Sequence, residues 1–408
     1  MLSNIDFKNY KKSTDIHGTS LYPAVMIAPM QNLILEEMIN KNNCKKIFDP
    51  FHGSGTALYE AKIISREVEV YGCDINPLAN LITTVKLQGV TDNIFDDIET
   101  LEFLIQNDDC SEKNHSFNNI NKWFRKDIID SLSIIRRSIM RIEDVKNRLY
   151  FWYNLSDIIR KYSNTRSSTY KLHIKPPYSI KNIENNVIKD YLNSVKNNVN
   201  MFQHSYTNFT LYKDDILKRI KNFEDGFFDI SITSPPYGEN ATTVPYGQFS
   251  MFPLYWIDNK DLELEGWELD NYSKIDNVSL GGQKRIAEFN NFEFNLLKPY
   301  LNEISDSKKQ KVINFFDDYF LFLRQLCRVT NKYIVMTLGN RTVDGININL
   351  TDITKKYLEY NNFINIDLAK REIPQKRMPL KVSTVNNKPV KSINHEYVII
   401  HEKQILNN

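Results

Sequence analysis

The residues best suited to chemistry are Ser234-Pro235-Pro236-Tyr237, which follow directly on an apolar strand expected over residues 228–233. The Ser234 hydroxyl and the Pro235 carbonyl both accept hydrogen bonds, and no N–H of Pro236 competes for that carbonyl, because proline lacks one. The two prolines stiffen the turn, and Tyr237 offers a flat aromatic face. Such a strand end can hold a planar amino group, for example the exocyclic amine of a nucleobase.

A proline pair after a strand is also ordinary turn punctuation, and the chain carries a second Pro-Pro-Tyr at residues 176–178. This copy follows Lys175, whose side chain only donates hydrogen bonds, in a polar and basic segment. We expect a plain loop there. The acceptor at Ser234 is what distinguishes the first copy.

Residues 45–74 have the pattern strand, glycine turn, helix, strand, acid. Strands are expected at 45–48 and 67–72 and a helix at 56–64, with Gly53-Ser54-Gly55 as the turn before Thr56. Glycine lets the backbone approach a ligand closely. Asp74 stands about 20 residues beyond the turn, where dinucleotide-binding folds hold a ribose diol. Asp49 and Asp74 are therefore candidates for the polar ends of an adenosyl cofactor.

The residues that follow the turn separate the possible ligands. A phosphate-binding loop requires lysine after the last glycine, where this chain has Thr56. A dinucleotide site requires a third small residue where Leu58 stands. S-adenosylmethionine, which carries no phosphate, fits best, and a strand–helix–strand unit without any ligand stays open at this point.

Together and in this order, the motifs resemble those of the amino-methyltransferases that modify exocyclic nitrogens of DNA bases. The resemblance rests on residues 49–56 (Asp-Pro-Phe-His-Gly-Ser-Gly-Thr), 74–79 (Asp-Ile-Asn-Pro-Leu-Ala) and 233–237 (Thr-Ser-Pro-Pro-Tyr). It extends to residues 17–24 and to strands at 332–338 and 395–401, so that it covers roughly half of the chain. Serine at position 234 is typical of the cytosine-N4 branch, whereas the adenine-N6 branch usually has Asp or Asn there.

The resemblance implies a role for each matched residue. The cofactor-binding set would be Tyr22, Pro23, Asp49, Phe51, Gly53, Ser54, Gly55, Thr56, Asp74, Ile75 and Asp215. Within this set Asp74 would bind the ribose, Ile75 would contact the adenine, and Asp215 would approach the adenine amino group, although Asp214 is equally well placed. The catalytic set would be Ser234, Pro235, Pro236 and Tyr237. Tyr246 and Phe249 could form a second wall for the base, but packing within their own loop is the simpler interpretation.

Length and composition agree with a soluble intracellular enzyme. The 408 residues exceed a minimal methyltransferase domain, and 41% of them are hydrophobic, enough for a packed core. No apolar run is long enough to span a membrane, and the first residues lack the apolar core of a signal peptide. Cys44, Cys73, Cys110 and Cys327 lack metal-ligand spacing, so we expect reduced thiols and no metal. These features predict a cytoplasmic protein, and the resemblance adds a prokaryotic or phage origin.

Charge is distributed in blocks, although the net charge is only +2. Residues 121–183 contain 14 Lys and Arg against 5 Asp and Glu, and residues 369–391 contain 7 against 1. Residues 258–276 contain 7 acids and 2 lysines. Such blocks favour one face turned to phosphates and another turned away, although any single block could simply be solvated.

The order of expected elements predicts a Rossmann-like α/β fold, with a mixed, mostly parallel seven-stranded sheet, helices on both faces and one antiparallel strand near the end. Residues 1–95 would form the cofactor half and residues 206–408 the catalytic half, with an irregular insertion at about 258–310. Residues 96–205 would form a mainly helical insertion, with helices at 128–140 and 145–162. Its basic string at 161–173 is the candidate for target recognition, unless the insertion is only a stabilising cap.

These expectations combine into a site-specific DNA methyltransferase that acts on cytosine N4 in duplex DNA, with S-adenosylmethionine as cofactor. The resemblance adds a cognate restriction endonuclease that acts on the same site as the expected partner. Adenine-N6 methylation of DNA, methylation of an RNA base and a DNA-binding scaffold without catalysis are the alternatives.

Overall fold

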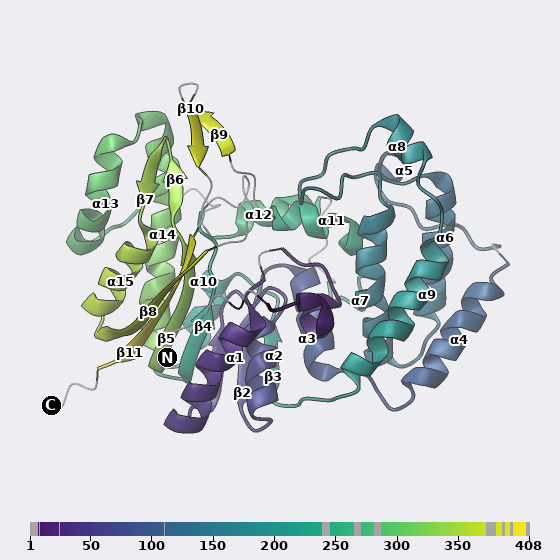
Figure 1. Cartoon of the computed structure of the whole chain (residues 1–408), viewed down its shortest axis with the longest axis horizontal. Coiled ribbons are helices and arrows are strands. Elements are labelled where there is room, and N and C mark those ends of the chain that lie inside the picture. The colour runs from purple at the N-terminus through teal and green to yellow at the C-terminus, as the bar shows by residue number, and fades with distance from the viewer. Residues whose placement is uncertain are drawn as a thin grey trace.

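The computed structural model describes residues 7, 9–23, 25–109, 111–238, 245–264, 271–280, 287–372, 381–385, 388–391 and 395–404. Figure 1 shows two parts, a sheet covered by helices and a helical part built mainly from residues 94–202. Helix α11 (Tyr246–Trp256) lies between them and packs on helices of both.

The sheet has seven strands in the order β3-β2-β1-β4-β5-β11-β8. These strands are β3 (Phe209–Tyr212), β2 (Glu69–Cys73), β1 (Lys46–Asp49), β4 (Phe228–Thr233), β5 (Thr330–Gly339), β11 (His395–Lys403) and β8 (Phe363–Glu372). Every neighbouring pair is parallel except those made by β11, which runs antiparallel to β5 and β8. The predicted fold class is therefore confirmed.

Strands β1 and β4 are neighbours in the middle of the sheet, with Ile47 opposite Ile230 and Phe48 opposite Ser231. Their side chains are buried on both faces, as expected for parallel strands covered by helices. Because the strands are parallel, their carboxyl ends meet at one edge, and ligands bind at that edge in open α/β sheets. The fold thus brings Asp49, at the end of β1, close to Ser234, which follows β4.

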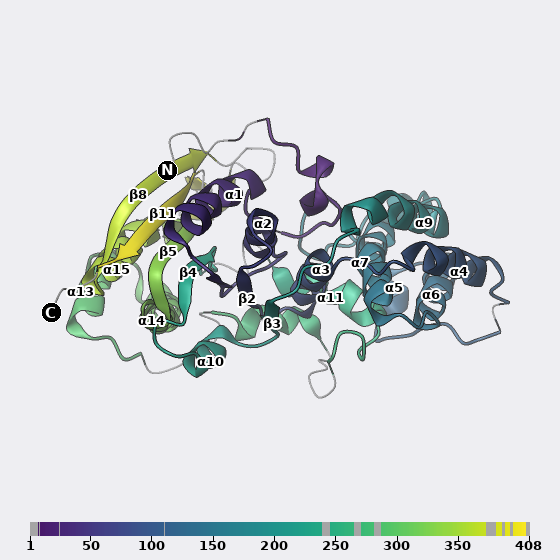
Figure 2. The ribbon, with the colours of Figure 1, turned by 90° about the horizontal axis from the view of Figure 1, so that it is seen from below.

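Helices cover both faces of the sheet (Figure 2). On one face lie α1 (Ala28–Glu36), α2 (Thr56–Ile64) and α3 (Pro77–Gln88). On the other lie α10 (Ile216–Arg219), α14 (Asp306–Val329) and α15 (Leu350–Tyr360). The bounds of α2 agree with the predicted helix.

The helical part consists of α4 (Ile94–Gln106), α5 (Ile120–Trp123), α6 (Lys126–Met140), α7 (Val145–Tyr162), α8 (Pro177–Lys181) and α9 (Val187–Asn198). The apolar spacing of residues 145–162 predicted α7, and one apolar core joins it to α3 and to the sheet. No helix in the described ranges is long and apolar enough to cross a membrane.

Two expectations about irregular segments are wrong. Residues 258–310 contain α12 (Ile275–Val278) and α13 (Asn291–Glu303), and α13 begins with a capping box between Asn290 and Glu293. The second Pro-Pro-Tyr is not a loop, because Pro177 starts α8. Proline suits the first turn of a helix, where its φ is already helical and its missing N–H is not needed.

Two small hairpins complete the fold: β6 (Arg341–Val343) with β7 (Ile346–Ile348), and β9 (Lys381–Val385) with β10 (Lys388–Lys391). Cys44, Cys73 and Cys327 are buried free thiols, whereas Cys110 lies outside the described residues.

Candidate active site

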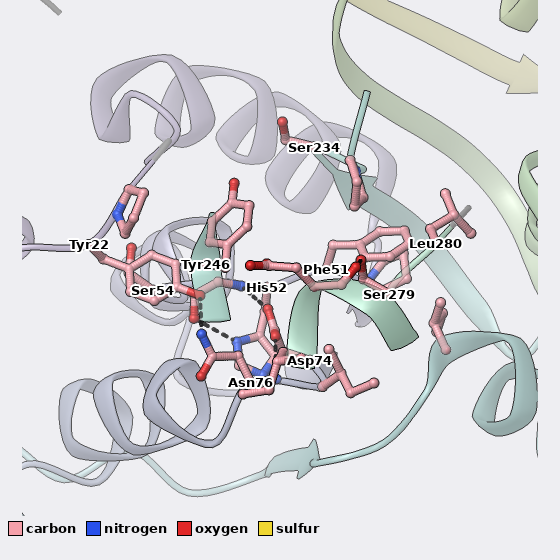
Figure 3. Close-up of a pocket in the computed structure, with 18 of the residues that line it drawn as sticks. Tyr22, Phe51, His52, Ser54, Asp74, Asn76, Ser234, Tyr246, Ser279 and Leu280 are labelled. Atoms are coloured by element: carbon pink, nitrogen blue, oxygen red, sulfur yellow. Dashed lines mark hydrogen bonds between the residues drawn. The ribbon is translucent and has the colours of Figure 1, made fainter. Parts of the chain in front are cut away.

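A pocket opens at the carboxyl ends of β1, β2, β3 and β4, and most of the predicted site residues line it (Figure 3). The predicted residues on its wall are Tyr22, Pro23, Phe51, Gly53, Ser54, Thr56, Asp74, Ile75, Asp215, Ser234 and Pro236. Asp49, Gly55, Pro235 and Tyr237 are not among the lining residues. Residues from both halves of the sheet therefore share one pocket.

Asp49 lies fully buried at the end of β1. Its Oδ1 atom accepts hydrogen bonds from the Thr233 hydroxyl (2.8 Å) and the Phe51 N–H (3.1 Å). Its Oδ2 atom is buried without a hydrogen-bond partner among the described residues. Burial raises the pKa of this carboxyl group to about 7. A cationic group close to Oδ2 would remove the cost of burying the charge.

Asp74, after β2, fixes the glycine turn. Its Oδ2 atom accepts a hydrogen bond from the Gly53 N–H (2.9 Å), and its Oδ1 atom accepts one from the Asn76 N–H (2.8 Å). A carboxylate oxygen can accept more than one hydrogen bond, so both oxygens keep capacity for the hydroxyl groups of a ribose. Ile75 and Phe51 add apolar surface to the same pocket.

The two glycines of the turn lie close to different parts of the protein. Gly55 has a left-handed backbone (φ +71°), and a Cβ atom there would lie 2.5 Å from Thr83 Cγ2 of α3. Gly53 is also left-handed (φ +50°), and its Cβ atom would lie 3.3 Å from the Tyr22 ring. We expected glycine because of a close ligand, but at Gly55 the close neighbour is helix α3, which could not be foreseen without the tertiary fold.

The N-terminal segment enters the pocket through Tyr22 and Pro23. Asn76 donates a hydrogen bond to the Tyr22 hydroxyl (3.2 Å), and the Tyr22 ring packs against Tyr246 at 5.9 Å between centroids. Helix α7 holds the preceding residues, because Asp157 accepts a hydrogen bond from the Leu21 N–H (2.9 Å). The helical part thus supports one wall of the pocket.

Ser234 lines the pocket (Figure 3), whereas Tyr237 is not among the lining residues. The Tyr237 hydroxyl lies 3.2 Å from Ser234 Oγ and donates a hydrogen bond to the Thr337 carbonyl of β5 (3.4 Å). A phenol has only one proton to donate, so in this arrangement the Ser234 hydroxyl donates to Tyr237. The lone pairs of Ser234 then remain available as acceptors. In this conformation Tyr237 orients Ser234 and does not present its face to the pocket.

Tyr246, at the start of α11, lines the pocket, whereas Phe249 is buried beneath it. Phe249 packs edge-on against Tyr22 and Tyr170, at 5.9 Å and 5.7 Å between ring centroids. The two aromatic residues that the sequence left undecided therefore differ in position: Tyr246 is at the pocket and Phe249 is packing.

Asp214 and Asp215 both line the pocket after β3. Asp215 caps α10 by accepting a hydrogen bond from the Leu217 N–H (2.9 Å), and Asp214 pairs with Arg219 (2.9 Å). Both carboxylates are therefore fixed, and the assignment of one of them to the adenine amino group stays a prediction.

Sequence reasoning missed the outer wall, which is formed by Ile275, Asp276, Val278, Ser279 and Leu280. The Asp276 carboxylate accepts a hydrogen bond from the Gly247 N–H (3.1 Å) and so holds the start of α11 beside Tyr246. Burial raises the pKa of Asp276 to about 6. An acid between Ile275 and Asn277 carries no signature of this contact, because its partner lies in another segment. His52 and Asn76 also line the pocket, and the sequence did not mark them as site residues either.

Salt bridges show which basic side chains of residues 121–183 are paired with a carboxylate. The acidic block does not lie on a separate face as expected, because Asp258 pairs with Arg136 (3.2 Å) and Asp261 with Arg148 (2.6 Å). Within the described residues, no carboxylate lies within salt-bridge distance of Arg166, Lys171, Lys175 or Lys181. Four basic side chains without a carboxylate partner among the described residues therefore lie between α7 and α9, and Lys122, Lys126 and Lys146 of the same block are likewise without one.

Residues 165–174 form a hairpin in that region, closed by a bridge between Thr165 and Ile174. Its Leu172 N–H donates a hydrogen bond to the side chain of Gln248 on α11 (3.0 Å). Arg160 of α7 donates to the Thr169 carbonyl (2.8 Å). Because Gln248 lies two residues after Tyr246, the hairpin stands close to the pocket.

Among the described residues, no group of three or more His, Cys, Asp or Glu side chains is arranged to hold a metal ion. The residues present fit an adenosyl cofactor with a positively charged end, because Asp74 lines the pocket and, behind the wall, Asp49 has a buried carboxylate oxygen without a partner among the described residues.

No protein-family model matches the chain. Over 415 aligned residues it is 31% identical to the type II methyltransferase M.MvaI of Kocuria varians, and the alignment covers 94% of this chain and 89% of that protein.

Proposed function

This chain belongs to the type II methyltransferase family, and on that premise we propose that it transfers a methyl group from S-adenosylmethionine to N4 of cytosine at a specific site in double-stranded DNA. The observation that carries the proposal is the shared pocket. Ser234, an acceptor suited to an amine, lies in the same pocket as Asp74 and the glycine turn, which are suited to an adenosyl cofactor.

The residues that would hold the cofactor fit its two polar ends. Asp49 Oδ2 would accept from its ammonium group, and Asp74 would accept from its ribose hydroxyls. When bound, the cofactor supplies an activated methyl group on a positively charged sulfur. The protein then has to orient the acceptor amine, and orientation alone can contribute a large part of a rate enhancement.

A cytosine N4 amine is a poor nucleophile, because its lone pair is delocalised into the ring. Ser234 Oγ and the Pro235 carbonyl would accept hydrogen bonds from its two hydrogens and favour a tetrahedral nitrogen with a localised lone pair. A base in a duplex cannot reach this pocket, so it must be flipped out, at a cost of a few kcal/mol. Tyr246 would offer one face for stacking.

For DNA recognition we propose the helical insertion, residues 96–205, and within it the 165–174 hairpin. Its exposed Arg166, Ser167, Ser168 and His173 are side chains that bind phosphates and base edges. The hydrogen bond between Leu172 and Gln248 brings the hairpin close to Tyr246 at the pocket, which supports this role. A restriction endonuclease that cleaves the same sequence would be the partner in a cell.

One experiment tests the substrate and the base together. The enzyme is incubated with duplex DNA and labelled S-adenosylmethionine, and the DNA is digested to nucleosides. We expect the label in N4-methylcytosine. Label in N6-methyladenine would retain the enzyme class and refute the base assignment. Label only in an RNA control, or in no nucleic acid, would refute the proposal in favour of an RNA enzyme or a non-catalytic binder.

A further inference from the structure

Three polar side chains, Asn80, Thr83 and Lys86, form a buried stripe along one face of α3, at intervals of three residues. Residues at this spacing are neighbours on a helix surface. The stripe packs against the glycine turn and the end of β2, which together carry the predicted cofactor residues. A hydrophobic core would place apolar side chains here, so the polar character needs a reason.

Each member of the stripe holds a backbone carbonyl. Asn80 donates to the Asp74 carbonyl (2.8 Å), Thr83 to the Gly53 carbonyl (3.0 Å) and the Lys86 ammonium to the Ser54 carbonyl (2.9 Å). These bonds turn three carbonyl groups toward α3 and away from the pocket. The side chains of α3 therefore fix the conformation of the backbone that lines the cofactor pocket.

Lys86 is the most unusual member, because a lysine with 1% exposure is rare unless its charge is compensated. Its Nζ atom lies 3.5 Å from His17 Nδ1, and His17 Nε2 lies 2.8 Å from Glu60 Oε1. Asn32 donates to the other oxygen of Glu60 (2.8 Å). The cluster joins the N-terminal segment, α1, α2 and α3 at one point behind Ser54.

We propose that Lys86 is a positioning residue for the cofactor: its buried ammonium group, compensated through His17 and Glu60, fixes the Ser54 carbonyl and with it the cofactor-binding turn. This inference rests on the proposed use of S-adenosylmethionine. It assigns to the buried cluster a function that the methyl-transfer chemistry itself does not require.

The protonation state of Lys86 is therefore expected to affect binding. Burial lowers the pKa of Lys86 to about 7, with Lys12 lowering it further and Asp15 and Glu60 raising it. Burial raises the pKa of Glu60, whereas the hydrogen bond from Asn32 and the charge of Lys86 lower it, so Glu60 and Lys86 favour each other's charged forms. Burial holds the pKa of His17 well below its usual value. The other ring groups here are Tyr59, edge-on to His17, and His204, which contacts the backbone carbonyl of Lys86. A charged donor holds a carbonyl more strongly than a neutral amine, so Lys86 contributes most below pH 7.

The test compares Lys86→Met with Lys62→Met. Lys62 is also fully buried and donates to backbone carbonyls, those of Arg66 (3.0 Å) and Val68, but it lies at the far end of α2. S-adenosylmethionine affinity is measured by calorimetry at pH 6 and pH 9. We expect Lys86→Met to raise Kd about tenfold at pH 6 and less than about threefold at pH 9, as a charged hydrogen bond exceeds a neutral one. Lys62→Met should leave Kd unchanged at both.

The outcomes separate this inference from the proposed function. If the wild-type protein does not bind S-adenosylmethionine, the proposed function fails. If it binds and Lys86→Met binds equally well, or is weakened equally at both pH values, the positioning role is refuted. Should Lys86→Met not fold, Glu60→Gln provides the second test. Loss of that carboxylate lowers the pKa of Lys86, so affinity should begin to fall at a lower pH than in the wild type, and an unchanged pH profile refutes the inference.

Discussion

At the scale of single residues, the central question is how the Ser234 hydroxyl is kept free to accept a hydrogen bond. Ser234 could donate or accept, and its environment decides which. The Tyr237 hydroxyl bonds both to Ser234 (3.2 Å) and to the Thr337 carbonyl (3.4 Å), and the second contact uses its only proton. The tyrosine therefore has a role that an aromatic face alone would not fulfil.

This arrangement predicts different results for two substitutions. Ser234→Ala should lower kcat by about 100-fold or more, the order seen when one preorganised polar group is removed from an active site. Tyr237→Phe keeps the ring and loses only the hydroxyl, so kcat should fall about tenfold, the equivalent of one ordinary hydrogen bond. Single-turnover methylation measures both, and Kd for S-adenosylmethionine should stay the same. Full activity of Tyr237→Phe would show that the ring, and not the hydroxyl, is the functional part.

If Asp49 binds the cofactor as proposed, we expect it to make cofactor binding and stability depend on pH in opposite directions. Its pKa rises from 3.8 to about 7 in the folded protein, so the folded state binds more protons than the unfolded state between these values. Stability without cofactor should therefore fall as pH rises through this range. A cationic ligand favours the carboxylate, so binding below pH 7 should release protons.

Calorimetry in buffers of different ionisation enthalpy measures this release. At pH 6.5 the cofactor amine is still protonated, because α-amino groups titrate at about 7.7–8.0. We expect a release that shrinks toward pH 8 in the wild type and is clearly smaller in Asp49→Asn. Equal proton release by both proteins would exclude Asp49 as the group that titrates.

At the scale of elements, the turn between β1 and α2 is fixed by its fit to α3. Gly55→Ala and Gly345→Ala both place a side chain on left-handed backbone, at φ +71° and φ +81°. Nothing lies within 4 Å of the Cβ position at Gly345, whereas at Gly55 the Thr83 side chain lies at 2.5 Å. The pair therefore separates backbone strain from a steric clash.

We expect Gly345→Ala to cost about 1–2 kcal/mol in the free energy of unfolding, from strain alone. Gly55→Ala should cost about 1–3 kcal/mol more, from overpacking against α3, and should also weaken cofactor binding. Urea denaturation and calorimetric titration measure the two effects. Similar costs for both variants would show that α3 yields easily and that the close fit to Thr83 is unimportant.

The same element shows what a sequence can and cannot predict. The strand–turn–helix–strand pattern predicted the bounds of α2 and the position of Asp74 after β2, because apolar periodicity and glycine act locally. The reason for Gly55 and the contact of Asp276 with Gly247 depend on segments far apart in the chain. Helix α8 was missed because a proline pair can start a helix as well as a turn.

At the scale of the whole molecule, charge must guide a polyanion to the correct edge of the sheet. The net charge of +2 gives no such guidance, and ion pairs with Asp258 and Asp261 neutralise part of the basic helical block. The 165–174 hairpin and its flanks retain positive charge beside α11, at the edge that carries the pocket. DNA bound there could place one base at Ser234.

Arg166→Ala tests this placement, because Arg166 is exposed on the hairpin. Loss of one phosphate contact should weaken DNA binding and reduce the slope of log K against log salt concentration by about 0.9. The matched control is Lys41→Ala. Its side chain is 72% exposed, but it precedes β1 and so lies at the opposite edge of the sheet. Fluorescence anisotropy with duplex DNA across a salt series measures both. The salt slope should change for Arg166→Ala alone. An unchanged slope for Arg166→Ala, or an equal change for Lys41→Ala, would mean that DNA approaches by another face, and recognition would then have to be sought outside the hairpin.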